Sequence, residues 1–232
     1  EEREADHQDE PDATIQPHQN GTDALARWLY EQLTPSDFVA KHAWLFDARS
    51  SFPVRYRSPE EPSKLLAHAQ RRCITELANR SDRWALLARL GNRVYLPWLS
   101  RLLAESTWAE ELEQQLPQLE SCGPQLAIWF LAWRLSRRDF AEVERWLRRF
   151  AAEQRPTDAA LLAQLLTGGG AERDAQLWNI LDSLGEQSCE AYWQKVEVHG
   201  LSSPAPVAST ERAIRHLMDV ERWEAAKTTT II

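Results

Sequence analysis

The chain is divided into many short amphipathic segments, and this pattern restricts its fold more than any other feature. Apolar residues recur three and four positions apart in segments of roughly 10 to 15 residues, which is the spacing of one helix face. Gly-Pro, Gly-Asn and Pro-Thr-Asp turns separate the segments. No window shows the sustained apolar–polar alternation, bounded by hairpin turns, that indicates strands. The sequence therefore predicts an all-α protein.

The first two expected helices are capped by Thr22 or Asp23 and by the Thr34–Asp37 turn. Further helices are expected at about 63–79, 82–90, 93–105, 107–120, 124–137, 139–153, 157–166, 171–184, 187–197 and 208–226. The last of these could be split near Val220. Helices joined by short turns pack antiparallel, so we expect hairpins stacked as an irregular α-solenoid, with a compact helical bundle as the alternative.

The most apolar stretch is AIWFLAWRL at 127–135, and it raises the question of a membrane segment. It is far shorter than the ~20 apolar residues that a spanning helix needs. The apolar stretch also ends in charged residues, Arg134, Arg137 and Arg138. We therefore expect an interior helix that packs on its neighbour at 139–153, and no membrane association.

The chain is expected to have three parts. Residues 1–21 are polar and acidic with few apolar side chains, which is typical of a flexible linker or tail. Residues 22–226 carry the helical pattern and are expected to form one α-helical repeat domain, whereas 227–232 are expected to be a frayed end. The proline-rich stretch 48–63 is the longest internal loop and the best place for a binding loop. The chain starts without Met, so we expect a segment of a longer polypeptide.

The net charge of -8 argues against a nucleic-acid clamp, because such a surface needs a basic field. The cysteines, Cys73, Cys122 and Cys189, are far apart and form no CxxC motif, so neither a disulfide framework nor a zinc site is predicted. They are interpreted as small, partly buried apolar residues in a reducing cytoplasm. The predicted location is cytoplasmic.

No motif for catalysis or cofactor binding is present. His42 and His68 have no second ligand at metal-binding spacing, so structural or surface roles are expected for both. The Gly168–Gly170 run lacks the Lys-Ser/Thr and the preceding strand of a phosphate loop. We therefore expect no catalytic residue, no cofactor and no metal.

Exposed aromatic and basic side chains are the remaining candidates for function. Three tryptophans lie near predicted helix ends, where an indole could be half exposed and available to a partner. The arginines at 134–149 could bind an acidic partner, or form a mixed exposed face with the acidic residues nearby. The candidate partner surface comprises Trp44, Trp98, Trp193, Arg138, Arg145 and Arg149.

Three stretches carry a resemblance: KHAWLFD at 41–47, CEAYWQKVEVHGL at 189–201 and ERAIRHLMDVERWEAA at 211–226. Together they resemble repeated segments in the helical-repeat regions of large multidomain bacterial proteins. Some of those proteins carry nucleotide-switch or other effector domains linked to conflict or signalling. The resemblance implies a solenoid segment, and it transfers no catalytic residue because the effector motifs are missing here.

These observations favour a non-catalytic α-helical repeat segment that serves as a scaffold or protein-recognition surface within a larger bacterial protein. Its partner would be another protein or a neighbouring domain of the same polypeptide. One alternative is a nucleic-acid adaptor that uses the Arg-rich helix at 134–149. The other is an enzyme with a pocket between helices.

Overall fold

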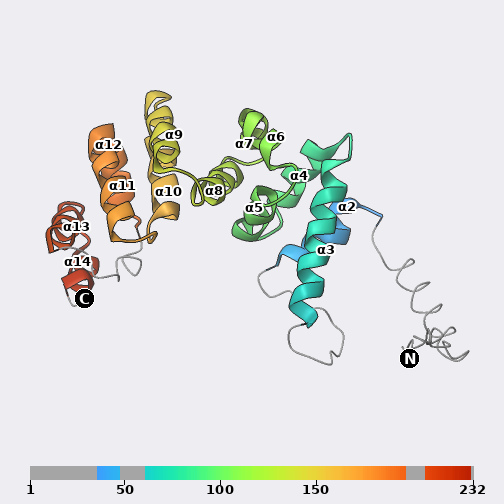
Figure 1. Ribbon diagram of the computed structural model, residues 1–232, viewed down its shortest axis with the longest axis horizontal. Helices are drawn as coiled ribbons and strands as arrows, with labels where there is room; N and C mark the ends of the chain where they lie inside the picture. The colour runs from blue at the N-terminus through green and yellow to red at the C-terminus, as the bar shows by residue number, and fades with distance from the viewer. Residues whose placement is uncertain (1–35, 48–60, 197–206, 231–232) are drawn as a thin grey trace, which may run out of the picture. The chain divides into compact units, whose positions relative to one another are not determined.

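The computed structural model describes residues 36–47, 61–196 and 207–230 (Figure 1). All regular structure in these ranges is helical, and they contain no strand, so the prediction of an all-α fold is confirmed. Contacts divide the chain into two units, Glu1–Lys41 and His42–Ile232. The boundary between them lies inside the range 22–226 that is expected to form one domain. The expected linker at 1–21, the first helix and loop residues 48–60 lie outside the described residues.

Residues 36–41 are the described part of the first unit. The short helix α2 (Phe38–His42) begins there, and Phe38 and Val39 are buried. The Asp37 carboxylate accepts a hydrogen bond from the Ala40 backbone N–H at 2.9 Å, as a side-chain cap does at a helix start.

The second unit begins with the 3-10 helix η1 (Ala43–Phe46). The α-helices that follow are α3 (Glu61–Ala78), α4 (Arg83–Gly91), α5 (Leu96–Ala104), α6 (Ala109–Gln114), α7 (Leu116–Cys122), α8 (Pro124–Leu135), α9 (Phe140–Ala152), α10 (Pro156–Leu166), α11 (Ala171–Leu184), α12 (Glu186–Trp193), α13 (Val207–Asp219) and α14 (Trp223–Thr230). Prolines in the first turn begin α8 and α10, where the missing N–H leaves no helical bond unmade.

Two expected helices are each divided into two in the structure, and the helix expected at 187–197 ends at Trp193. The segment expected at 107–120 is two helices, α6 and α7, which break at Gln115. Pro117 accounts for the break. In an uninterrupted helix its ring would clash with the backbone carbonyl of residue 113, and it has no N–H to donate to that carbonyl. The helix expected at 208–226 is split between Asp219 and Trp223, where Glu221 has a φ of 61°, so the alternative break near Val220 is confirmed. The second piece, α14, continues to Thr230, beyond the expected end of the helical domain.

Helix α8, which contains AIWFLAWRL, is an interior helix. It packs against α5, α7, α9 and α10. Its buried side chains cover most of its circumference: Leu126, Ala127, Ile128, Phe130, Leu131, Ala132 and Leu135. Each large one stabilises the fold by about 1.5–3 kcal/mol through burial, and this accounts for the apolar character of the stretch. Among the described helices, none combines the length and the apolar character that a bilayer span requires.

The C-terminal helices position the site described next. Helix α12 packs on α10 and α11, and it also contacts α13. Tyr192 of α12 is fully buried, and its hydroxyl accepts a hydrogen bond from Trp178 Nε1 at 2.9 Å. The same hydroxyl lies 2.8 Å from Thr167 Oγ1. This satisfied polar network fixes α12 against its two neighbours.

Candidate functional site

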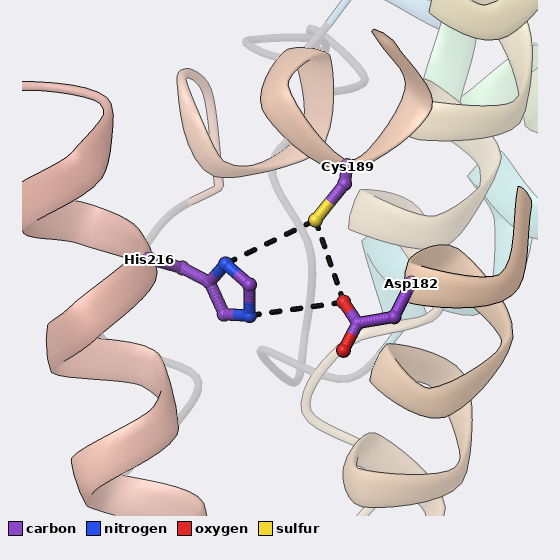
Figure 2. Close-up of side chains that lie close together, drawn as sticks. All are labelled: Asp182, Cys189 and His216. Atoms are coloured by element: carbon purple, nitrogen blue, oxygen red, sulfur yellow. Dashed lines mark hydrogen bonds and ion pairs between the residues drawn. The ribbon is translucent and has the colours of Figure 1, made fainter. Parts of the chain in front are cut away.

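Three helices bring a carboxylate, a thiol and an imidazole together (Figure 2). Asp182 lies in the last turn of α11, Cys189 in the first turn of α12 and His216 on α13. Gly185 makes the sharp turn between α11 and α12 with a φ of 106°, a conformation that L-residues with a Cβ rarely adopt. The turn brings Asp182 and Cys189 to the same end of the helix pair.

The side chains of Asp182, Cys189 and His216 are close enough to interact, and we call them the Asp–Cys–His cluster. The Cys189 thiol donates to Asp182 Oδ1 at 3.4 Å. Cys189 Sγ lies 4.0 Å from His216 Nδ1, and His216 Nε2 lies 3.7 Å from Asp182 Oδ1. One potential ligand atom from each residue lies within 4.8 Å of the other two.

A buried aromatic wall supports the imidazole. The His216 ring stacks on Trp193 with centroids 4.9 Å apart and an interplanar angle of 9°. Trp193 in turn packs on Trp178, with ring centroids 5.3 Å apart, and edge-on against Tyr192 at 5.1 Å. Because Trp193 is only 1% exposed, it gives the imidazole a fixed platform.

Arg212 orients the carboxylate. It lies one helical turn before His216 on α13, so the two side chains share a face. Its guanidinium donates to Asp182 Oδ2 and, at 2.6 Å, to Asn179 Oδ1. With Oδ2 engaged in this way, Oδ1 is the oxygen directed at the thiol and the imidazole.

The cluster lines a cavity of about 430 Å³. Its lining residues are Asp182, Gly185, Glu186, Cys189, Glu190, Trp193, His216, Asp219 and Val220. Four of these side chains are carboxylic acids, and none is lysine or arginine. Such a lining produces a negative potential that attracts cations.

The Cys189 thiol lacks the properties of a catalytic nucleophile. Burial and the hydrogen bond to Asp182 raise the pKa of Cys189 to about 11, against smaller opposing effects of Trp193 and Arg212. A catalytic cysteine needs a lowered pKa, because the thiolate is the reactive form. In nucleophilic triads the imidazole lies between nucleophile and carboxylate and accepts the nucleophile's proton. Here the His216 ring faces both groups, but the thiol donates to the Asp182 carboxylate, at 3.4 Å, and lies farther from the imidazole, at 4.0 Å. The donor set is instead the kind that holds a metal ion.

The predicted aromatic candidates have different environments. Trp44 of η1 and Trp98 of α5 are 43% and 44% exposed, which is the half-exposed position predicted for their indoles. For Trp193 the prediction is wrong, because its indole is enclosed by Trp178, Tyr192 and His216. Nearness to a helix end does not decide exposure when another helix covers that end.

The predicted basic candidates are ion-paired. Arg138 lies 2.7 Å from Glu113 and 2.8 Å from Glu142. Arg145 lies 3.8 Å from Glu142. Arg149 binds Glu153 at 2.8 Å, and its guanidinium lies 4.8 Å from the Trp146 ring centroid. These contacts agree with the alternative of a mixed exposed face.

The sequence analysis did not find the Asp–Cys–His cluster. Cys189 is interpreted there as a small apolar residue, and Asp182 and His216 are not singled out. One local signal was available, since Asp182 and Cys189 flank Gly185 at similar distances along the chain. The contribution of His216 depends on the packing of α13 beside α12, which no spacing within one segment reveals.

The fold and the cluster define an all-α protein with a thiol, an imidazole and a carboxylate in one acidic cavity. Comparison of the chain with protein-family models, curated proteins and solved structures finds no match. The resemblance to bacterial helical-repeat regions stays a prediction.

Proposed function

We propose that this chain is a non-catalytic α-helical repeat segment of a larger bacterial protein in the cytoplasm, and that it recognises a protein partner. The observation that carries the proposal is an exposed aromatic pair at the start of α5. Tyr95 and Trp98 are 50% and 44% exposed, and they are one helical turn apart. Tyrosine and tryptophan are the residues that most often dominate the energy of protein interfaces.

The packing order of the helices supports a stacked arrangement. The most extensively packed pairs include α5 with α8, α10 with α12, α13 with α14 and α4 with α7. Each pair joins helices close to one another in chain order, as in an irregular α-solenoid of antiparallel hairpins. Small-angle scattering separates this arrangement from a compact bundle, because a globular chain of this length would have a radius of gyration of about 17 Å.

The charge distribution favours a protein partner over a nucleic acid. Every arginine in the range 134–149 forms an ion pair with a glutamate: Arg134, Arg137, Arg138, Arg145, Arg148 and Arg149. A nucleic acid would have to displace these glutamates against a net charge of -8. The raised pKa of the Cys189 thiol likewise weighs against nucleophilic catalysis.

Site-specific photo-crosslinking tests this function. A photoreactive phenylalanine analogue replaces Trp98 in the full chain, expressed in the native cell. The matched control places it at Gln118, an exposed position on α7. We expect a discrete protein adduct from position 98 that weakens when Tyr95→Ala is added. Equal labelling from positions 98 and 118 would contradict recognition by this aromatic pair.

A further inference from the structure

We propose that Asp182, Cys189 and His216 bind one divalent transition-metal ion, with zinc as the expected occupant. This site goes beyond the recognition role and does not depend on it. The sequence analysis predicts no zinc site, because it considers ligands only at short, regular spacing. Here the ligands come from α11, α12 and α13, and they are brought together by the Gly185 turn and by helix packing.

The chemistry of the donors selects the ion. Thiolate and imidazole ligands favour zinc over calcium and magnesium, which prefer sets of oxygen atoms. Three protein ligands leave a fourth tetrahedral position, which would face the cavity and hold water. On binding, the Cys189 S–H bond breaks, a metal–sulfur bond forms and the proton leaves to solvent.

The distances fit a tetrahedral site if the His216 ring moves. With bonds of roughly 2.0 Å to nitrogen or oxygen and 2.3 Å to sulfur, tetrahedral zinc ligands lie about 3.3–3.5 Å apart. The separation between Cys189 Sγ and Asp182 Oδ1 is already 3.4 Å. The two imidazole separations involve different ring nitrogens: Nδ1 lies 4.0 Å from the sulfur, and Nε2 lies 3.7 Å from Oδ1 (Figure 2). One ion binds only one of these nitrogens, and one ligand atom from each residue lies within 4.8 Å of the other two. To complete the set, the His216 ring would have to turn and move about 1 Å toward the other two side chains.

The buried indole of Trp193 could donate a hydrogen bond to a thiolate at Cys189. The Trp193 side chain is only 1% exposed, and its Nε1–H has no hydrogen-bond acceptor. An unpaired buried donor costs free energy. The indole is close enough to Cys189 to interact with its sulfur. A metal-bound sulfur would supply the missing acceptor, as outer-shell groups do in metal sites.

Two further features suit a cation. Arg212 binds Asp182 Oδ2, which leaves Oδ1 for the metal and fixes the carboxylate from behind. Glu186, Glu190 and Asp219 add negative charge around the cavity without contributing to the cluster itself. They would raise the local concentration of metal cations.

Cobalt substitution provides the direct test, with the full chain freed of metal by a chelator and kept in excess magnesium. One equivalent of Co²⁺ should give the intense visible bands of tetrahedral cobalt and a near-ultraviolet thiolate charge-transfer band, and one equivalent of Zn²⁺ should abolish both. Cys189→Ala and His216→Ala should remove the charge-transfer band or weaken binding at least tenfold. The controls Cys122→Ala and His68→Ala should keep it.

A milder variant tests the indole separately. Trp193→Phe keeps an aromatic platform for His216 but lacks the N–H, so zinc affinity should fall about tenfold while the cobalt bands persist. Circular dichroism establishes that each variant is folded. The proposal is overturned when the folded wild-type chain shows no charge-transfer band, when the band survives Cys189→Ala, when His216→Ala keeps both the band and the wild-type affinity, or when Trp193→Phe binds zinc as tightly as wild type. None of these readouts involves a protein partner, so crosslinking at Trp98 is decided independently.

Discussion

The reactivity of Cys189 offers a quantitative test of the site's electrostatics. Because the pKa of Cys189 is about 11, only about one thiol in ten thousand is ionised at pH 7, against about 3% for an ordinary cysteine of pKa 8.5. Thiolate populations therefore differ by about 300-fold. A more basic thiolate is also the stronger nucleophile, and this raises the alkylation rate of each thiolate by about tenfold. Alkylation of the metal-free protein should thus be about 30-fold slower than that of a free thiol.

The assay is alkylation by iodoacetamide at several pH values, with peptide mass spectrometry to separate Cys189 from the other cysteines. The rate should rise close to tenfold per pH unit from pH 7 to 10 without a plateau, since the pKa lies above that range. Limited access alone would slow alkylation equally at every pH relative to a free thiol. Asp182→Asn removes a charge that opposes ionisation, so it should speed the reaction at pH 7. A plateau near pH 8 would refute the proposed environment of the thiol.

Three further substitutions test the fold through the free energy of unfolding, measured by denaturant titration. Leu131→Ala should cost about 2–5 kcal/mol, because it opens a cavity inside the fully packed helix α8. Tyr192→Phe should cost about 1–3 kcal/mol by leaving Trp178 Nε1 without its acceptor. Asp174→Ala should cost a similar ~1–3 kcal/mol, because the buried carboxylate accepts from Gly168 N–H at 3.0 Å. Asp174→Asn keeps an acceptor and should stay within about 1 kcal/mol of wild type.

The positions of most described helices were predictable from the sequence. Gly123-Pro124 predicts the start of α8 because both residues act locally on the backbone. The break at Gln115 was missed, although its cause is also local. Pro117 lies within a run of helix-favouring residues, and their periodicity outweighs one proline in a pattern-based prediction. Local chemistry thus predicted most of the helices, and errors arose where two local signals compete.

Exposure and the candidate site were less predictable, because both depend on contacts between helices distant in sequence. Trp98 and Trp193 both lie near helix ends, yet one is exposed and the other is buried under α13. Likewise, the Gly185 turn is visible in the sequence, whereas the approach of His216 depends on α13 packing beside α12. The composition of each helix face indicates what it can bury, but it does not identify the helix that covers it.

The stacking of His216 on Trp193 has a consequence for what can enter the cavity. One face of the imidazole is covered by a parallel indole at 4.9 Å, so nothing can be inserted on that side. An incoming group can approach the opposite face of the ring or its edge, where the nitrogen atoms lie. A flat aromatic molecule therefore cannot stack on the face that Trp193 covers, whereas a small ion can still reach the ring nitrogens. The shape of the site at His216 therefore restricts which molecules can bind, in addition to the charge of the cavity.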